Sequence, residues 1–156
     1  MNLMLQFILA SLGTIGFAIV SSTPKESLIK TGIIGGAGWA IYVYLTRQNA
    51  PLFFSYFLSA AFLSLAGEIA ARIFHNPATV FIIPAIIPLV PGYSLYLSML
   101  EFMSGSYDKG IQKGVETLFG AAAIAVGIIL ASSIARIFYQ QYNKYKIRIQ
   151  KSSRAK

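Results

Sequence analysis

Cysteine is absent from the 156-residue chain, and His75 is its one histidine. Without thiols the chain can form neither disulfides nor thiolate metal sites, and one imidazole cannot hold a metal ion by itself. Only five residues are acidic, and the sequence motifs of zinc proteases, phosphate-binding loops and serine hydrolases do not occur. Nothing in the sequence therefore indicates an enzyme, and we expect no catalysis, no cofactor and no metal.

Charge is also scarce, because charged residues make up 12% of the chain and hydrophobic residues 56%. This composition is typical of a protein whose solvent is the lipid bilayer, which about 20 consecutive apolar residues can cross as a helix. We predict an all-α integral membrane protein with about five transmembrane helices in one membrane domain, residues 1–140. The predicted spans are residues 3–21, 28–46, 52–72, 79–100 and 117–139. Because the second run is the shortest, the alternative is four spans, with that segment re-entrant or interfacial.

Basic residues give the chain a net charge of +8, but their position argues against nucleic-acid binding. Six of the thirteen lie in residues 141–156, directly after the last predicted span. Anionic lipid on the cytoplasmic side attracts such a segment, and Tyr139, Tyr142 and Tyr145 are typical of the membrane interface. We therefore expect a basic cytoplasmic tail at 141–156, membrane lipid as a partner and no nucleic acid. Five spans place the N-terminus outside, whereas four spans place both ends inside.

Three prolines interrupt the fourth hydrophobic run: Pro84, Pro88 and Pro91, followed by Gly92. Proline lacks the N–H of a helical hydrogen bond and its ring clashes with the preceding turn, so a regular helix is not expected. One interpretation is a kinked packing helix. We favour a discontinuous helix near the bilayer midplane, where helix ends and freed carbonyls bind a substrate or ion. Gly92 would permit unusual backbone angles, and Tyr96 is a weaker candidate for a hydroxyl contact.

Glu68 and Arg72 are ionisable residues near the end of the third run. Their spacing of four residues puts them on one helix face, where they can form an ion pair. Two interpretations remain open: a structural pair at the end of a helix, or a transport role in which they interact with a proton and a substrate carboxylate. Glu116 precedes the last run, where a carboxylate would stabilise a helix N-terminus.

The second run contains Gly32 and Gly36, whose spacing of four lets another helix backbone approach closely. We expect these glycines to serve helix packing. The aromatic residues of this run, which we expect to face lipid or the interface, are Trp39, Tyr42 and Tyr44. The polar segment from Glu101 to Glu116 is interpreted as an outer loop, with room for a short helix before the last span.

The stretch from Glu68 to Arg72 (EIAAR) and residues 77–92 (PATVFIIPAIIPLVPG) resemble the threonine/serine exporter family. The similarity extends to Gly16-Phe17-Ala18 and to Glu116-Thr117-Leu118, and it covers nearly the whole chain. The chain resembles the small split form of that family, which corresponds to the C-terminal membrane half of the long exporters. It departs from many relatives at Tyr93 and Ser94, where they carry glycine.

The resemblance implies a secondary exporter in the bacterial inner membrane that moves threonine and serine outward at the expense of the proton gradient. Some split members look like exporters of dicarboxylates such as succinate. The resemblance also implies a partner: a larger, homologous five-span subunit that carries a soluble N-terminal region.

These expectations combine into one hypothesis about function. The chain would be a subunit of a proton-coupled exporter of small polar metabolites, with the segment from Pro84 to Gly92 as its site. Glu68 and Arg72 would be the proton and carboxylate partners of that site. Two alternatives remain open: a membrane scaffold or assembly subunit without direct substrate contact, and a homo-oligomeric carrier or channel.

Overall fold

The computed structural model describes the backbone of residues 2–154 and the side chains of residues 2–139. Every regular element in these residues is helical, which confirms the predicted all-α class. The elements in chain order are α1 (Leu3–Val20), α2 (Lys25–Arg47), α3 (Leu52–Ile73), α4 (Ala78–Ile86), the 3-10 turn η1 (Ile87–Leu89), α5 (Gly92–Met103) and α6 (Tyr107–Arg154). Residues 141–154 of the predicted tail continue α6, and the side chains of that tail, including Tyr142 and Tyr145, lie outside the described residues.

The described helices include four or five candidate membrane spans, in agreement with the prediction of about five. α1, α2, α3 and residues 107–139 of α6 are each long and apolar enough as single helices. The fifth candidate is α4 with η1 followed by α5, and these two parts meet at 44°. The second hydrophobic run, whose alternative was a re-entrant segment, is one continuous helix of 23 residues. The bend therefore lies in the proline-rich run, as predicted.

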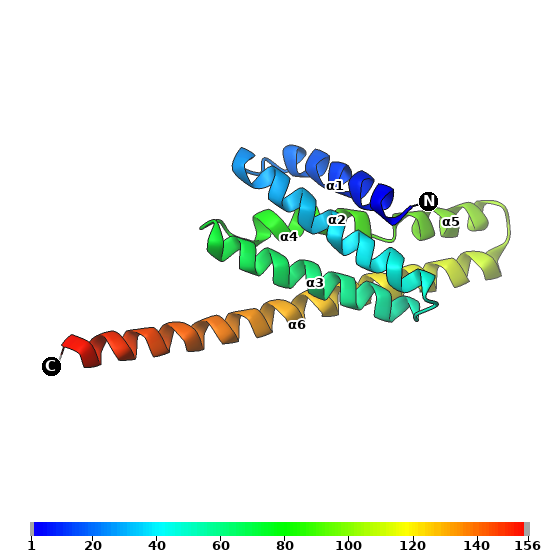
Figure 1. Ribbon diagram of the computed structural model, residues 1–156. Helices are drawn as coiled ribbons and strands as arrows, with labels where there is room; N and C mark the ends of the chain where they lie inside the picture. The colour runs from blue at the N-terminus through cyan, green and yellow to red at the C-terminus, as the bar shows by residue number, and fades with distance from the viewer. Residues whose placement is uncertain (1, 155–156) are drawn as a thin grey trace.

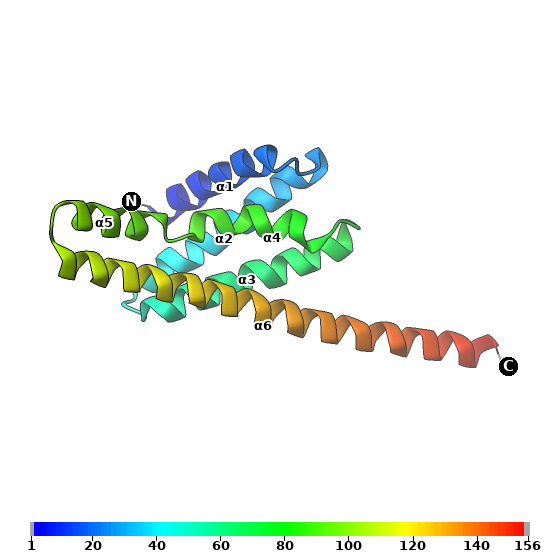
Figure 2. The ribbon, with the colours of Figure 1, turned by 180° about the vertical axis from the view of Figure 1, so that it is seen from behind.

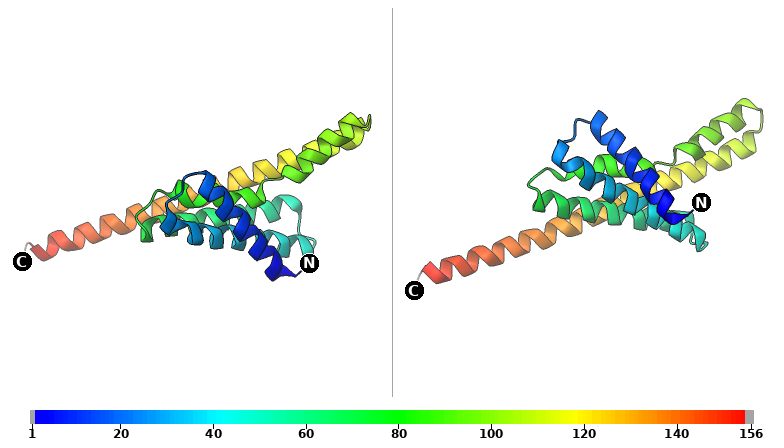
Figure 3. Two further views of the ribbon diagram at one scale, coloured as in Figure 1. Left: turned by 90° about the horizontal axis from the view of Figure 1, so that it is seen from above. Right: turned by 45° about the horizontal axis from the view of Figure 1, so that its top comes forward.

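The first four helices form a bundle in which α2 lies between α1 and α3 (Figure 1). α4 packs against α2 and α3, while α6 runs first along α5 and then along α3 (Figure 2). The hairpin of α5 and the start of α6 projects beyond the bundle, and the rest of α6 extends from the opposite end (Figure 3). The broken span thus begins inside the bundle and ends in the projecting hairpin.

Small residues set the distance between α1 and α2. A methyl group added to Gly32 would lie 2.6 Å from Cγ1 of Ile15, and one added to Gly36 would overlap Oγ of Ser11. In a bilayer the hydrophobic effect does not drive helices together, because lipid tails are as apolar as the side chains of the helices. Helices in a membrane therefore associate through close van der Waals packing of this kind. The structure thus places Gly32 and Gly36 at the contact between α1 and α2.

The aromatic residues of α2 do not all face outward as expected. Trp39 and Tyr42 are partly buried, and their ring centroids lie 5.2 Å apart. The ring of Tyr42 in turn lies 4.5 Å from that of Tyr56 on α3. Trp39 and Tyr42 therefore do not face outward with their whole rings, because contacts with α1 and α3 cover part of each. Tyr44 is exposed, as expected for a ring that faces lipid or the interface.

The segment from Glu101 to Glu116, interpreted as an outer loop, is mostly helical. α5 continues to Met103, a turn at Gly105 with φ of +80° reverses the chain, and α6 begins at Tyr107. Oγ of Ser98 donates a hydrogen bond of 2.7 Å to the carbonyl of Gly110, which fastens the two helices. Glu116 consequently lies within α6, where its carboxylate is 2.7 Å from Nζ of Lys113. The expectation that Glu116 stabilises a helix N-terminus is therefore wrong, because packing against α5 extends α6 backward.

Candidate transport site

The break between α4 and α5 follows from missing hydrogen-bond donors. Pro84 lies within α4, and Pro88 cannot donate to the carbonyl of Pro84, so the N–H of Ile87 donates to that carbonyl instead. This tightens the chain into η1, where the N–H of Val90 donates to the carbonyl of Ile87 over 3.3 Å. Bonds that span three residues rather than four thus satisfy backbone groups that the prolines leave without helical partners.

Pro91 separates η1 from α5. It adopts φ of −75° and ψ of 49°, outside the helical region, and α5 starts at the next residue. The N–H of Gly92 donates to the carbonyl of Val90 over 2.7 Å, which closes a tight turn. Gly92 has no positive φ, and no atom lies within 4 Å of an added methyl. The expected unusual backbone angles therefore do not occur at Gly92, because Pro91 makes the turn.

Two pockets lie beside the broken span. The first has a volume of about 180 Å³ and includes Pro84 and Thr79 of α4 in its wall. Hydroxyl groups from the end of α1 and the following turn complete it, and these belong to Ser21, Ser22 and Thr23. It is therefore rich in groups that can both donate and accept hydrogen bonds.

The second pocket has a volume of about 330 Å³ and includes Pro88 of η1 together with Gln6, Gly13 and Trp39. The indole Nε1–H of Trp39 donates to Oε1 of Gln6 over 2.7 Å, so the side-chain amide of Gln6 is held in a fixed position. Gln6 is near the start of α1 and Ser21 is beyond its end. The second pocket therefore lies along α1 from Gln6 to Gly13 and the first lies at the other end of α1, and each is bordered by one of the prolines Pro88 and Pro84.

A second group of functional side chains lies between α3 and α6. The carboxylate of Glu68 is buried, with Oε2 lying 3.2 Å from Nη2 of Arg72 and Oε1 lying 3.6 Å from Nε of Arg136. The predicted pair of Glu68 and Arg72 is therefore present, and it belongs to a cluster of three charges that joins two helices. Burial of an ionised carboxylate requires such partners, because an unpaired charge loses its hydration without compensation.

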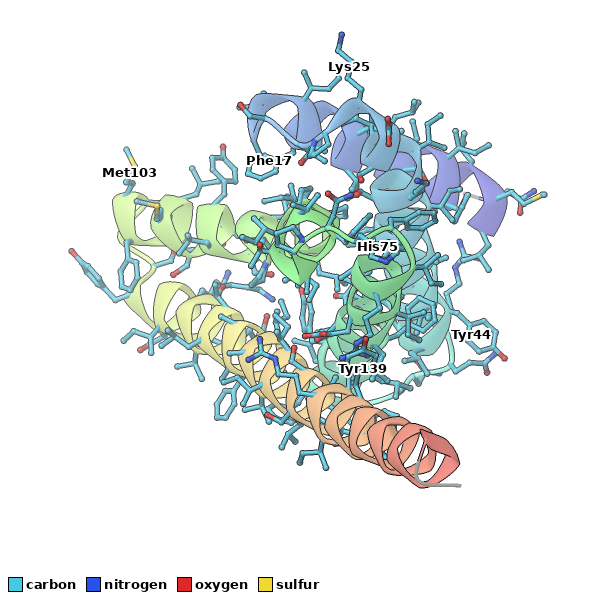
Figure 4. The ribbon with its side chains drawn as sticks, turned by 90° about the vertical axis from the view of Figure 1, so that its left-hand side faces the viewer. Phe17, Lys25, Tyr44, His75, Met103 and Tyr139 are labelled. Carbon is cyan, nitrogen blue, oxygen red and sulfur yellow. The ribbon has the colours of Figure 1, made fainter. Side chains whose placement is uncertain are left out.

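The two arginines of this cluster have different environments. Besides its bond to Glu68, Nη2 of Arg72 donates to the carbonyl of Ala135 over 3.1 Å. The Arg72 guanidinium also stacks on Tyr139, with Cζ 4.6 Å from the ring centroid. Figure 4 shows Tyr139 and His75 at the same end of the bundle. The Arg72 side chain is 26% exposed, whereas that of Arg136 is 71% exposed.

Serine hydroxyls continue this contact one turn along α3 and α6. Oγ of Ser64 lies 2.7 Å from Oγ of Ser132, and it also lies within hydrogen-bond distance of the carbonyl of Ile128. Ser132 and Arg136 line a pocket of about 290 Å³ on the surface of α6. The polar side of the contact between α3 and α6 therefore runs from Ser64 to Arg72.

The predicted site residues fall into separate groups. Glu68 and Arg72 meet each other between α3 and α6. Pro84 and Pro88 line the two pockets of the broken span instead, and Gly92 is exposed where α5 begins. Tyr96 is 60% exposed on α5 and takes no part in either group.

Sequence reasoning missed Arg136, Ser132, Gln6 and Trp39 as site residues. Arg136 lies inside the predicted span 117–139, directly after the charge-free residues 117–135, and the sequence alone assigns it no role. Gln6 is the one carboxamide between Leu3 and Pro24, and a polar amide in a long apolar run was an available signal. Neither residue has a partner nearby in sequence, so only the packing of the helices reveals their roles.

Comparison with known proteins supplies the family. The model of the family described as "Threonine/Serine exporter, ThrE" matches residues 6–134. A curated protein of Haemophilus influenzae, described as "Uncharacterized protein", is 25% identical over 150 residues, which cover 90% of this chain and 49% of the relative. The chain thus spans about half the length of that relative, and no solved structure matches. Because the family model covers most of the chain, including both groups of candidate site residues up to residue 134, this protein belongs to the threonine/serine exporter family.

Proposed function

We propose that this chain forms one half of a two-subunit exporter for small polar metabolites, and that its broken span lines the substrate pathway. The observation that carries this proposal is the bend at Pro88 and Pro91, with one pocket beside each part of the proline-rich segment. A discontinuous helix in a transporter supplies helix ends and polar groups to a cavity in the membrane. A kinked helix that serves only packing would not require the hydroxyl-rich pocket beside Pro84.

The other half of the exporter would be a larger, homologous five-span subunit with a soluble N-terminal region. The matched residues cover 49% of a relative from Haemophilus influenzae, so this chain corresponds to about half of that protein. This supports a second subunit that supplies the other half. Transporters commonly consist of two related halves with the substrate site between them. The projecting hairpin of α5 and α6, which extends beyond the other helices, provides surface for such a contact (Figure 3).

The substrates we propose are threonine and serine or a dicarboxylate such as succinate, and the coupling ion is the proton. Exporter membership supports outward movement of small metabolites. Glu68 is the acidic residue buried between α3 and α6, and it is therefore the candidate for taking part in coupling. The protein would reside in the bacterial inner membrane with its C-terminus in the cytoplasm, where the basic residues after 140 meet anionic lipid.

Flux measurements in proteoliposomes test this proposal. Vesicles would contain this chain alone, the larger subunit alone or both, and uptake of radiolabelled threonine, serine and succinate would be followed with and without an imposed proton gradient. We expect gradient-dependent flux of one substrate class only when both chains are present. Flux with this chain alone would favour a homo-oligomeric carrier or channel. Full flux with the larger subunit alone would reduce this chain to a scaffold or assembly subunit.

A further inference from the structure

Arg136 is a charged side chain that its neighbours satisfy only in part. Its Nε lies 3.6 Å from Glu68 Oε1, and among the described residues Glu68 is its one hydrogen-bond or ion-pair partner. Its side chain is 71% exposed, compared with 7% for Glu68. A guanidinium can form a planar pair of hydrogen bonds with a carboxylate, and residues 2–139 leave most of this donor capacity of Arg136 unused.

The cluster of Glu68, Arg72 and Arg136 has an excess of positive charge that an anion could neutralise. Two guanidiniums, those of Arg72 and Arg136, share the one carboxylate of Glu68, which leaves one net positive charge. Arg72 faces inward to Glu68, to the carbonyl of Ala135 and to the Tyr139 ring. The excess charge is therefore presented outward by Arg136.

The surroundings of Arg136 form a small polar pocket. It has a volume of about 290 Å³, and Ser132, Ser133 and Arg136 contribute hydroxyl and guanidinium groups to its wall, with Ile128 and Ile129 as the apolar part. All five lining residues belong to α6, and the volume is just below the lower limit of about 300 Å³ for small-molecule sites. The pocket therefore has room for a small group such as a carboxylate, and a surface from another chain would have to complete a site for a whole metabolite.

A position of the Arg136 guanidinium against lipid tails would be energetically unfavourable. Glu68, which pairs with Arg136, stands five residues before the end of α3 at Ile73, or about 8 Å along the helix axis. A guanidinium at such a depth is costly against hydrocarbon, and arginines in spans instead face a protein interior, a water-filled cavity or a headgroup. We therefore expect the pocket to face water, a polar protein surface or lipid headgroups.

We propose that Arg136, Ser132 and Ser133 form a binding site for the carboxylate group of the transported metabolite, and that Glu68 is the counter-ion of Arg136 when the site is empty. The incoming carboxylate replaces Oε1 of Glu68 at the Arg136 guanidinium, while Glu68 keeps its bond to Arg72. The weaker of the two contacts, at 3.6 Å against 3.2 Å, is the one exchanged. This inference rests on the proposed function, because it assigns the part of the exporter that recognises substrate charge.

If the substrate carboxylate replaces that of Glu68 at Arg136, substitutions of Arg136 and of Glu68 should change carboxylate binding in opposite directions. Replacing Arg136 with Gln removes the charged donor and should weaken carboxylate binding by about tenfold or more. Replacing Glu68 with Gln removes the competitor and should strengthen binding. Replacing Lys109 with Gln removes an equal charge from the exposed start of α6 and should leave binding unchanged. A purely structural ion pair predicts the same direction of change for Arg136 and Glu68.

Chemical modification with phenylglyoxal provides the test on the unaltered protein. The complex would be reconstituted in phosphatidylcholine vesicles, and modification of Arg136 would be followed by mass spectrometry with L-threonine, succinate or neither present. We expect one of these carboxylates to slow modification of Arg136 several-fold, whereas threonine amide and succinamide have no effect. Modification of Arg47, at the far end of α2, is the internal control and should not respond.

Several results would overturn the assignment. They are an Arg136 that does not react even without solute, equal protection by the amides, and no protection by either carboxylate. Protection by phosphatidylglycerol in the vesicles with none by the solutes would identify a lipid headgroup contact instead, and this too would refute a metabolite site. If flux occurs without protection of Arg136, the inference fails and the exporter proposal stands. Protection without flux in any combination of chains contradicts the exporter proposal and leaves the binding site intact.

Discussion

The guanidinium of Arg136 on α6 lies 3.6 Å from the buried carboxylate of Glu68 on α3. This ion pair connects helices that are separated in the sequence by the whole broken span and its hairpin. The contact between Ser64 and Ser132 joins α3 and α6 as well. A substitution at Glu68 is therefore expected to alter the packing of both helices. The charged cluster therefore connects α3 of the bundle to α6, the helix that packs against α5.

Replacing Glu68 with Gln should impair export without preventing assembly with the larger subunit. The variant leaves two guanidiniums without their carboxylate, which should lower the free energy of unfolding by about 1–3 kcal/mol. Flux in proteoliposomes and unfolding in mixed micelles measure the two effects. The control is Glu116→Gln, whose pair with Lys113 is partly exposed and should contribute at most about 1 kcal/mol. Unaltered export in the Glu68 variant would remove this residue from the mechanism.

Replacing Pro88 and Pro91 together with Ala should straighten the broken span and reduce transport. The substitutions restore two N–H donors, so the bend of 44° should fall below about 20°, the lower limit of a sharp kink. The distance between spin labels at positions 83 and 99 would report the change. Pro51→Ala, at the position before α3, is the control because it lies outside any helix interior. Wild-type flux in a straightened variant would argue against a broken-helix site.

Replacing Gly36 with Ala should destabilise the contact between α1 and α2. The added methyl would overlap Oγ of Ser11 and lie 2.8 Å from the carbonyl oxygen of Phe7, so we expect a cost of about 1–3 kcal/mol. Gly16→Ala is the matched control, since no atom lies within 4 Å of its added methyl and alanine should stabilise α1 by about 0.5–1 kcal/mol. Thermal unfolding would compare them. Equal effects of the two variants would contradict the described packing.

Replacing Gln6 with Leu should destabilise the pocket beside Pro88. The indole N–H of Trp39 would lose its acceptor, at a cost of about 1–3 kcal/mol if no water replaces the amide. Trp39 is the one tryptophan of the chain, so its fluorescence reports the environment of this pocket directly. Gln112→Leu, at an exposed position on α6, is the control. An unchanged emission spectrum in the Gln6 variant would show that the hydrogen bond is not formed in the membrane.

The spans and the break could be predicted because their causes are local. Long apolar runs define the helices. Pro84 and Pro88 lack the N–H groups of helical hydrogen bonds, and this interrupts one of the helices whatever its neighbours are. The contact between Glu68 and Arg72 was accessible for the same reason, because a spacing of four residues fixes a common helix face.

The remaining features depend on which helix faces meet. Arg136 becomes part of the charged cluster only because α6 packs on α3, and Trp39 is partly buried only because α1 and α3 lie beside α2. The early start of α6 depends on its packing with α5 through Ser98. Helical periodicity alone cannot predict these relationships in a membrane protein, since lipid-facing and buried positions are both apolar.

Cysteine accessibility tests most directly whether the broken span lines a water-filled pathway. The natural chain has no cysteine, so single cysteines can replace Gly13 beside Pro88 and Thr79 beside Pro84, with exposed Leu12 and Leu118 as outward-facing controls. In the reconstituted two-subunit complex, we predict that a charged methanethiosulfonate reagent modifies the two pocket cysteines, that threonine or succinate slows this reaction, and that the control cysteines remain unmodified. Pocket cysteines as inert as the controls, or modified at a rate that no substrate changes, would contradict the account.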